Sequence, residues 1–125
     1  MNKNYFSILT GILLILSFTL MSSMNITKAD DIPEEVEKIL ENSCYGCHTT
    51  GAKAEKAVNA LDFKKWDKLK PTKKVGALND IKEVLDEGAM PPEKFLNRYP
   101  DKAPSEKDKE TILNWVKQET AKLME

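Results

Sequence analysis

Side chains that bind metals or form disulfides are scarce in this sequence. Its 125 residues include one histidine, His48, and two cysteines, Cys44 and Cys47. A structural zinc site needs about four ligands, more than this set supplies. A disulfide between cysteines three positions apart would close a very small loop and would hardly constrain the unfolded chain. The two cysteines therefore require a different explanation.

A basic excess is also missing. Residues 30–125 carry seventeen basic and twenty acidic side chains, a formal net charge of −3. A general nucleic-acid-binding protein would show a strong positive charge, so we expect no nucleic-acid partner. The sequence shows no internal repeat and no low-complexity linker. These 96 residues are enough for one small hydrophobic core, and we expect one domain over residues 30–125.

The longest apolar run is too short for a membrane-spanning helix. It covers residues 8–21 and is interrupted by polar and small residues, whereas a spanning helix needs about 20 apolar residues. Lys3 precedes this run, and small Thr27 and Ala29 follow it, which is typical of a secretory signal peptide over residues 1–29. The alternative is an uncleaved N-terminal anchor. Both place the domain outside the cytoplasm, periplasmic or otherwise exported, and it contacts a membrane only if this segment is retained.

The period-two alternation of half-buried strands is absent from residues 30–125. Their apolar residues recur at intervals of three and four, which predicts an all-α fold of four or five helices. The first helix should start near Asp31, with Pro33 in its first turn, and run into Cys44. Further helices are expected over residues 53–61, from Asp62 to just before Pro71, from a start between Thr72 and Asn79 to Gly88, and from Ser105 to near the C-terminus.

Two proline-rich stretches are predicted to lie outside the helices. Met90-Pro91-Pro92 cannot form a helix interior, because proline lacks an amide donor and clashes with the preceding turn. Residues 100–104 are expected to form a loop. Ser105, with Asp108 three residues later, is expected to cap the last helix.

The sequence Cys44-Tyr45-Gly46-Cys47-His48 has the spacing of a c-type haem attachment motif. In such a motif the two thiols form thioethers to the haem, and the following histidine becomes the proximal ligand of the iron. We therefore predict one covalent haem c on Cys44 and Cys47, with His48 bound to iron. Three alternatives remain: a thioredoxin-like redox pair, which would want a βαβ context, a zinc site and a structural pair.

Met90 is the predicted distal iron ligand. No second histidine exists, and the other methionine of residues 30–125, Met124, lies at the extreme C-terminus, where fraying is expected. Met90 follows a predicted helix, and the two prolines after it restrict the loop, which lowers the entropy cost of presenting the sulfur. The alternative is that Met90 only fills a gap in the core.

The residues from about 34 to 123 resemble the small bacterial haem-binding domain family related to class I cytochromes c. The resemblance rests on the haem motif, on Leu61-Asp62-Phe63-x-x-Trp66, on Gly88-x-Met90-Pro91-Pro92, on Tyr99-Pro100 and on a final helix bearing Trp115. It implies a cytochrome c-like helical bundle wrapped around one covalently bound haem, with His48 and Met90 as axial ligands. The sequence departs from many relatives at Tyr99, where they have histidine. It also has only residues 49–59 in the place where some relatives carry a longer aromatic segment after the haem motif.

We predict a mono-haem electron carrier and not an enzyme. A thioether ligand favours ferrous iron and raises its reduction potential. The alternative is a sensor or binder of small ligands in which Met90 is displaced. A peroxidase would want an open distal site and a proton-handling group, and no distal histidine exists, so weak peroxidase activity is the only catalysis left open.

Other residues carry two interpretations each. A basic cluster is either a solvated face or a docking patch for an acidic redox partner; it consists of Lys64, Lys65, Lys68, Lys70, Lys73 and Lys74. Trp66 and Trp115 are expected to pack in the core or against the haem, with electron tunnelling as the alternative.

Overall fold

The computed structural model describes residues 32–125, and these residues are all-α, without a strand. The predicted signal peptide and its cleavage after Ala29 lie outside the described residues. Within the described part, no helix has the length and apolar character needed to cross a membrane. The all-α prediction is confirmed, with five α-helices and two 3₁₀ segments: α2 (Glu34–Ser43), α3 (Glu55–Ala60), η1 (Phe63–Lys68), α4 (Pro71–Asp86), α5 (Glu93–Leu96), η2 (Pro100–Lys102) and α6 (Glu106–Leu123).

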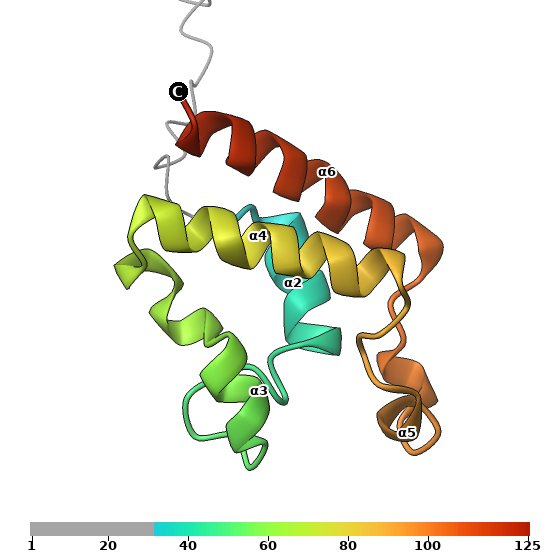
Figure 1. Cartoon of the computed structure of the whole chain (residues 1–125). Helices are drawn as coiled ribbons and strands as arrows, with labels where there is room; N and C mark the ends of the chain where they lie inside the picture. Colours follow the sequence, from blue (N-terminus) through green and yellow to red (C-terminus); the bar gives the residue numbers. More distant parts are fainter. Residues whose placement is uncertain (1–31) are drawn as a thin grey trace, which may run out of the picture.

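The core lies where α2, α4 and α6 meet. In Figure 1, α4 and α6 lie side by side and α2 passes behind α4, and both α4 and α2 contact α6. The apolar stripe of each helix faces this junction, as helical periodicity requires. The buried hydrophobic side chains of this core are Val36, Leu40, Phe63, Trp66, Leu78, Ile81, Ile112, Trp115 and Val116.

Trp66 and Trp115 belong to this core, as one of their two interpretations expected. They are 2% and 5% exposed, and their ring centroids lie 5.6 Å apart. Lys74 is a correction to the predicted cluster of solvated lysines. It is 3% exposed, and its Nζ lies 5.7 Å from the centroid of the Trp66 ring, where a cation is favourable over the negative face of the indole.

The starts of two helices differ from the prediction. Pro33 is not in the first turn of α2: its ψ of 142° is extended, so it is the N-cap and the helix begins at Glu34. The predicted cap at Asp31 lies outside the described residues. Helix α4 begins earlier than expected, at Pro71. Proline suits this first position, where its missing amide donor would have no helical partner.

The turns that end or begin the other helices are those that the sequence predicts. Gly88 has φ +66° after α4, and the amides of Gly88 and Ala89 donate to the carbonyls of Leu85 and Val84 at 3.2 and 2.8 Å, the pattern of a Schellman C-cap. Ser105 and Asp108 form the expected capping box of α6. The 3₁₀ turn η2 is a correction, because a loop was predicted over residues 100–104, and helix α5 is an addition in a stretch for which no element was predicted.

Candidate functional site

The Cys-x-x-Cys-His segment leaves the C-terminal end of α2 in a single tight turn. Cys44 is the C-cap, and its amide donates to the carbonyl of Leu40 at 2.7 Å. The amides of Cys47 and His48 then donate to the carbonyl of Cys44 at 3.1 and 3.0 Å. These bonds hold both thiols and the imidazole on one turn of chain.

His48 is oriented by a backbone carbonyl from the segment before η1. Its Nδ1 lies 3.1 Å from the carbonyl oxygen of Leu61. Because a carbonyl can only accept a hydrogen bond, Nδ1 carries the proton and Nε2 keeps its lone pair free for a metal. The amide of Phe63 also donates to the carbonyl of His48 at 2.9 Å, and the two rings meet edge to face. The sequence analysis missed this role of Leu61, because a main-chain acceptor leaves no side-chain signal.

Asp62 holds the loop after His48 against η1. It is 9% exposed; its carboxylate accepts hydrogen bonds from the amide of Thr50 at 2.9 Å and from the Thr50 hydroxyl, and it pairs with Lys65 Nζ at 3.3 Å. It also caps η1 through the amide of Lys64, as the sequence predicted. The bonds from Thr50, together with those from Lys65 and Lys64, lower the pKa of Asp62 below its ordinary value despite its burial. Asp62 therefore fixes the loop while ionised.

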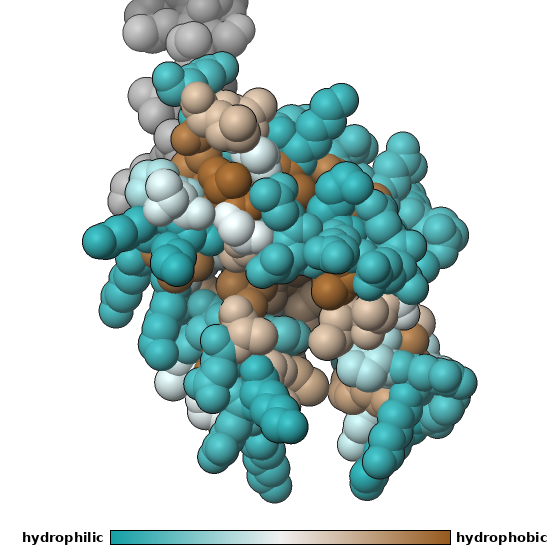
Figure 2. Space-filling view, viewed as in Figure 1, coloured by the Kyte–Doolittle hydropathy of each residue, from teal (hydrophilic) through white to brown (hydrophobic). Residues whose placement is uncertain are grey.

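An apolar cleft opens beside His48. Two contiguous cavities of about 380 and 160 Å³ together are in the size range of cofactor sites. Their walls share Cys44, His48, Ala60, Leu85, Met90 and Ile112. Figure 2 shows the hollow between the lobes that contain α3 and α5, with hydrophobic atoms at its inner end. The larger cavity is further lined by Ser43, Cys47, Ala54, Lys56, Ala57, Pro91, Pro92, Phe95 and Pro104.

One wall of the cleft is made of small side chains. Ala54, Ala57 and Ala60 follow one another at intervals of three and all line the larger cavity. Such a strip leaves room for a flat ligand close to the backbone of α3. The sequence analysis did not single out these alanines, although their spacing is a readable signal. It also missed Phe95, because α5 was not expected.

Met90 lies in the wall of both cavities. Its amide donates to the carbonyl of Val84 at 3.2 Å, so the loop leaves directly from the capped end of α4. Met90 is 37% exposed and does not belong to the buried core, which argues against a mere gap-filling role. All four residues predicted from the sequence, Cys44, Cys47, His48 and Met90, thus line one cleft.

The surroundings of Cys44 are not those of a reactive thiol. Both cysteines are free, and burial, with a smaller contribution from Cys47, raises the pKa of Cys44 to about 11. Cys44 sits at the C-terminal end of α2, where the helix dipole disfavours an anion, whereas reactive thiolates sit at helix N-termini or beside cations. Within residues 32–125, no three His, Cys, Asp or Glu side chains are grouped to hold a metal ion.

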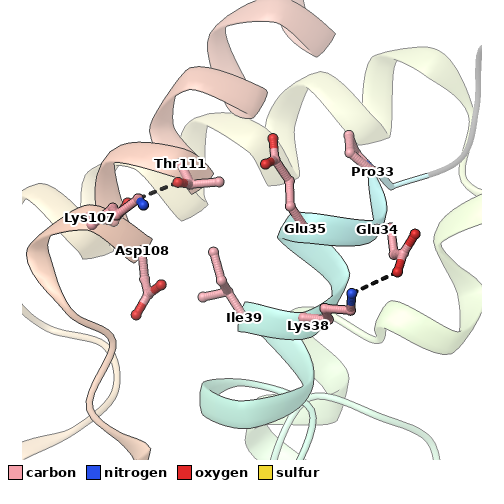
Figure 3. Close-up of a pocket in the computed structure, with 8 residues that line it drawn as sticks. All are labelled: Pro33, Glu34, Glu35, Lys38, Ile39, Lys107, Asp108 and Thr111. Atoms are coloured by element: carbon pink, nitrogen blue, oxygen red, sulfur yellow. Dashed lines mark hydrogen bonds and ion pairs between the residues drawn. The ribbon is translucent and has the colours of Figure 1, made fainter.

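A second hollow, of about 580 Å³, lies between α2 and α6 but does not resemble a cofactor site. Figure 3 shows its residues spread over two helices, with local bonds from Lys38 to Glu34 at 2.7 Å and from the Thr111 hydroxyl to the carbonyl of Lys107 at 2.9 Å. Its lining combines charged residues with no cysteine or histidine. The chemistry therefore concentrates in the cleft.

Comparison with known proteins gives a match to a protein-family model. The family model described as haem-binding domain matches residues 51–118, which is more than half of the chain. The match contains α3, Met90 and most of α6, and it begins just after His48. No curated protein and no solved structure is significantly similar to the chain. An apolar cleft faced by an oriented histidine fits this match, and the chain belongs to the haem-binding domain family.

Proposed function

We propose that the protein is an exported mono-haem c-type cytochrome that carries single electrons. One observation supports this most strongly: Cys44, Cys47, His48 and Met90 line the same apolar cleft, with His48 Nδ1 bonded to Leu61. Export is proposed from residues 1–29, with the mature chain beginning at Asp30. An N-terminus at Met1 in the membrane fraction would favour the uncleaved anchor instead.

The residues of the cleft fit haem in their chemistry. Cys44 and Cys47 would form the thioethers, and His48 Nε2 and the Met90 sulfur would bind the iron. Among the described residues that line the larger cavity, Lys56 is the one with a permanent charge. Its ammonium would face one of the haem carboxylates. When bound, haem supplies an iron that alternates between the ferric and ferrous states.

The protein's own groups favour electron transfer over catalysis. His48 is held by Leu61 and Met90 by the end of α4, so two ligands are positioned before any redox change. Beside His48, the larger cavity offers mostly apolar and small side chains. The one carboxylate of the described residues that lines the cleft, Asp80 in the smaller cavity, is exposed at the surface. A peroxidase would want a proton-handling group at the distal side.

A ligand sensor is the second candidate, and one observation favours it. Met90 is 37% exposed on a loop outside the core, so displacing it would cost little core packing. The two functions differ in the response of the iron to carbon monoxide. In a carrier Met90 stays bound to the iron and carbon monoxide does not bind, whereas in a sensor carbon monoxide displaces Met90.

Covalent haem is tested on the protein produced with haem-attachment machinery. The haem should remain with the polypeptide through acid–acetone extraction, and the spectrum should be six-coordinate, low-spin and unchanged by carbon monoxide. The Cys44→Ser/Cys47→Ser variant should release its haem in the same extraction. Haem that leaves the wild-type chain would refute the c-type proposal, and a carbon monoxide complex would favour the sensor.

A further inference from the structure

Charge is distributed unevenly along the domain. Residues 51–75 contain eight lysines and three acidic residues, whereas the rest of residues 30–125 contains nine basic and seventeen acidic residues. A domain with a net charge of −3 therefore includes one strongly positive segment. This segment forms α3, η1 and the first turn of α4.

The structure exposes the positive charges of this segment more than its negative ones. Asp62 is buried and bonded to Thr50, so Glu55 and Asp67 are its exposed acids. Lys74 is buried over Trp66. Figure 2 shows hydrophilic side chains projecting from the side of the molecule that carries α3 and the segment leading to α4. The seven exposed lysines, which we call the lysine edge, are Lys53, Lys56, Lys64, Lys65, Lys68, Lys70 and Lys73.

The lysine edge adjoins the cleft. Lys56 itself lines the larger cavity, on the same short helix as Ala57 and Ala60. Lys64 Nζ donates to the carbonyl of Thr50 at 3.3 Å, in the loop that follows His48. A molecule bound at this edge would therefore lie against the α3 wall of the cofactor site.

We infer that the lysine edge is the docking surface for an acidic one-electron donor or acceptor protein. This inference rests on the proposed electron-carrier function and names the kind of partner. The positive edge would turn the cleft toward an acidic surface and accelerate encounter, while the acidic remainder would disfavour other orientations. In each encounter one electron moves between partner and carrier, and no bond is made or broken.

A protein partner fits this edge better than a membrane does. The exposed large apolar residues of the described chain are Met90, Tyr99 and Met124, and none of them belongs to the lysine edge. The edge therefore has no apolar side chain to insert between lipids. The acidic remainder of the domain would also be repelled by an anionic bilayer.

Ferricyanide, a small anionic oxidant, is the probe for the test. The reduced haem protein is mixed with it in a stopped-flow instrument at low and high salt. If the net negative charge of the domain repels ferricyanide, the reaction should be slow, and salt should accelerate it by screening the repulsion. If ferricyanide binds at the lysine edge, the reaction should be fast, and salt should slow it by screening the attraction. We expect the second behaviour, with a rate about tenfold lower in high salt. A polyglutamate peptide should compete with ferricyanide and slow the reaction at low salt.

Two variants of equal charge separate the lysine edge from the rest of the surface. Lys53→Glu/Lys68→Glu alters the edge and leaves Lys64 and Lys65, which hold Thr50 and Asp62, in place. Lys107→Glu/Lys117→Glu makes the same charge change on α6. The first should slow the low-salt reaction several-fold more than the second, with the haem spectrum unchanged in both.

Equal effects of the two variants, or a reaction that salt accelerates, would overturn the docking surface. Binding of the protein to vesicles rich in phosphatidylserine, lost in Lys53→Glu/Lys68→Glu, would assign the edge to a membrane instead. A preparation whose haem leaves the polypeptide in acid–acetone extraction would refute the c-type assignment whatever its reaction with ferricyanide. Failure of the cytochrome assignment is thus distinct from failure of the docking surface.

Discussion

At the scale of single residues, Met90 is the proposed second protein ligand of the haem iron. Met90→Ala should remove the weak far-red sulfur-to-iron band of the oxidised protein, lower the reduction potential and open the iron to carbon monoxide. The haem should stay attached through Cys44 and Cys47. Absorption spectra and a redox titration measure these effects.

Met124→Ala is the matched control, because Met124 is 74% exposed at the end of α6. It should leave the band, the potential and the carbon monoxide response unchanged. A Met90→Ala protein with the wild-type spectrum would contradict the assignment and would move the sensor ahead of the carrier.

Asp62 holds the loop after His48, and its contribution to the stability of the protein should depend on pH. Its pKa is lowered in the folded protein, chiefly by the hydrogen bonds from Thr50. Its stabilising effect is therefore present above the ordinary pKa of an aspartate, about 3.9, and is lost as the pH falls through the lower pKa of the folded state. Denaturant unfolding between pH 5 and about pH 3 should show a smaller loss of stability in Asp62→Asn than in the wild type.

Asp67→Asn is the control for this pH dependence. Asp67 lies on η1 but is exposed and takes no part in the bonds to Thr50. Asp67→Asn should therefore lose as much stability as the wild type does when the pH falls. If both variants showed the same slope, the bonds around Asp62 would not contribute to stability.

At the scale of elements, two glycines of the α4 region should respond oppositely to alanine. Gly88 ends α4 with φ +66°, a conformation that costs an L-residue roughly 1 kcal/mol, so Gly88→Ala should destabilise the protein by about that amount. Gly76 lies within α4, and an added Cβ would meet nothing within 4 Å. Gly76→Ala should therefore stabilise the protein by about 0.5–1 kcal/mol.

Denaturant titration of the haem-loaded proteins measures both glycine variants. The Gly88→Ala protein should also show a weakened far-red band, because the turn at Gly88 directs the chain to Met90. A Gly88→Ala protein as stable as the wild type would contradict the Schellman cap as the reason for Gly88.

Helices α3 and α5 depend on the cleft more than the other helices do. Neither contains a fully buried residue, whereas α2, α4 and α6 share the core. Their lining side chains, such as Ala57 and Phe95, face the cavity. A bound cofactor would therefore supply the apolar contacts that the two short helices lack.

At the scale of the whole molecule, removing haem should loosen the two sides of the cleft first. In Cys44→Ser/Cys47→Ser without haem, the amides of α3 and α5 should exchange with solvent much faster than in the loaded protein. The core amides of α4 and α6 should lose less protection, because these helices pack against each other as well as lining the cleft. Hydrogen exchange followed by mass spectrometry measures this, and uniform loss of protection would refute it.

Local signals in the sequence predicted most of the fold correctly. The apolar spacing predicted the helical fold, Gly88 predicted the end of α4, and Ser105 with Asp108 predicted the start of α6. Those signals act within a few residues of one another. The start of α4 at Pro71 was missed because a proline that interrupts one helix also suits the first turn of the next.

Some features of the candidate site could be predicted from the sequence, whereas others depend on the tertiary structure. The sequence by itself was enough to propose the donor set, since Cys44, Cys47 and His48 are neighbours and Met90 has one terminal competitor. The tertiary structure decided that α3 and α5 form the walls, that the Leu61 carbonyl orients His48, and that Lys74 is buried over Trp66 while its neighbours stay exposed. These features join residues distant in sequence or depend on packing around them. The chain must fold before main-chain carbonyls, small side chains and buried charges acquire their roles.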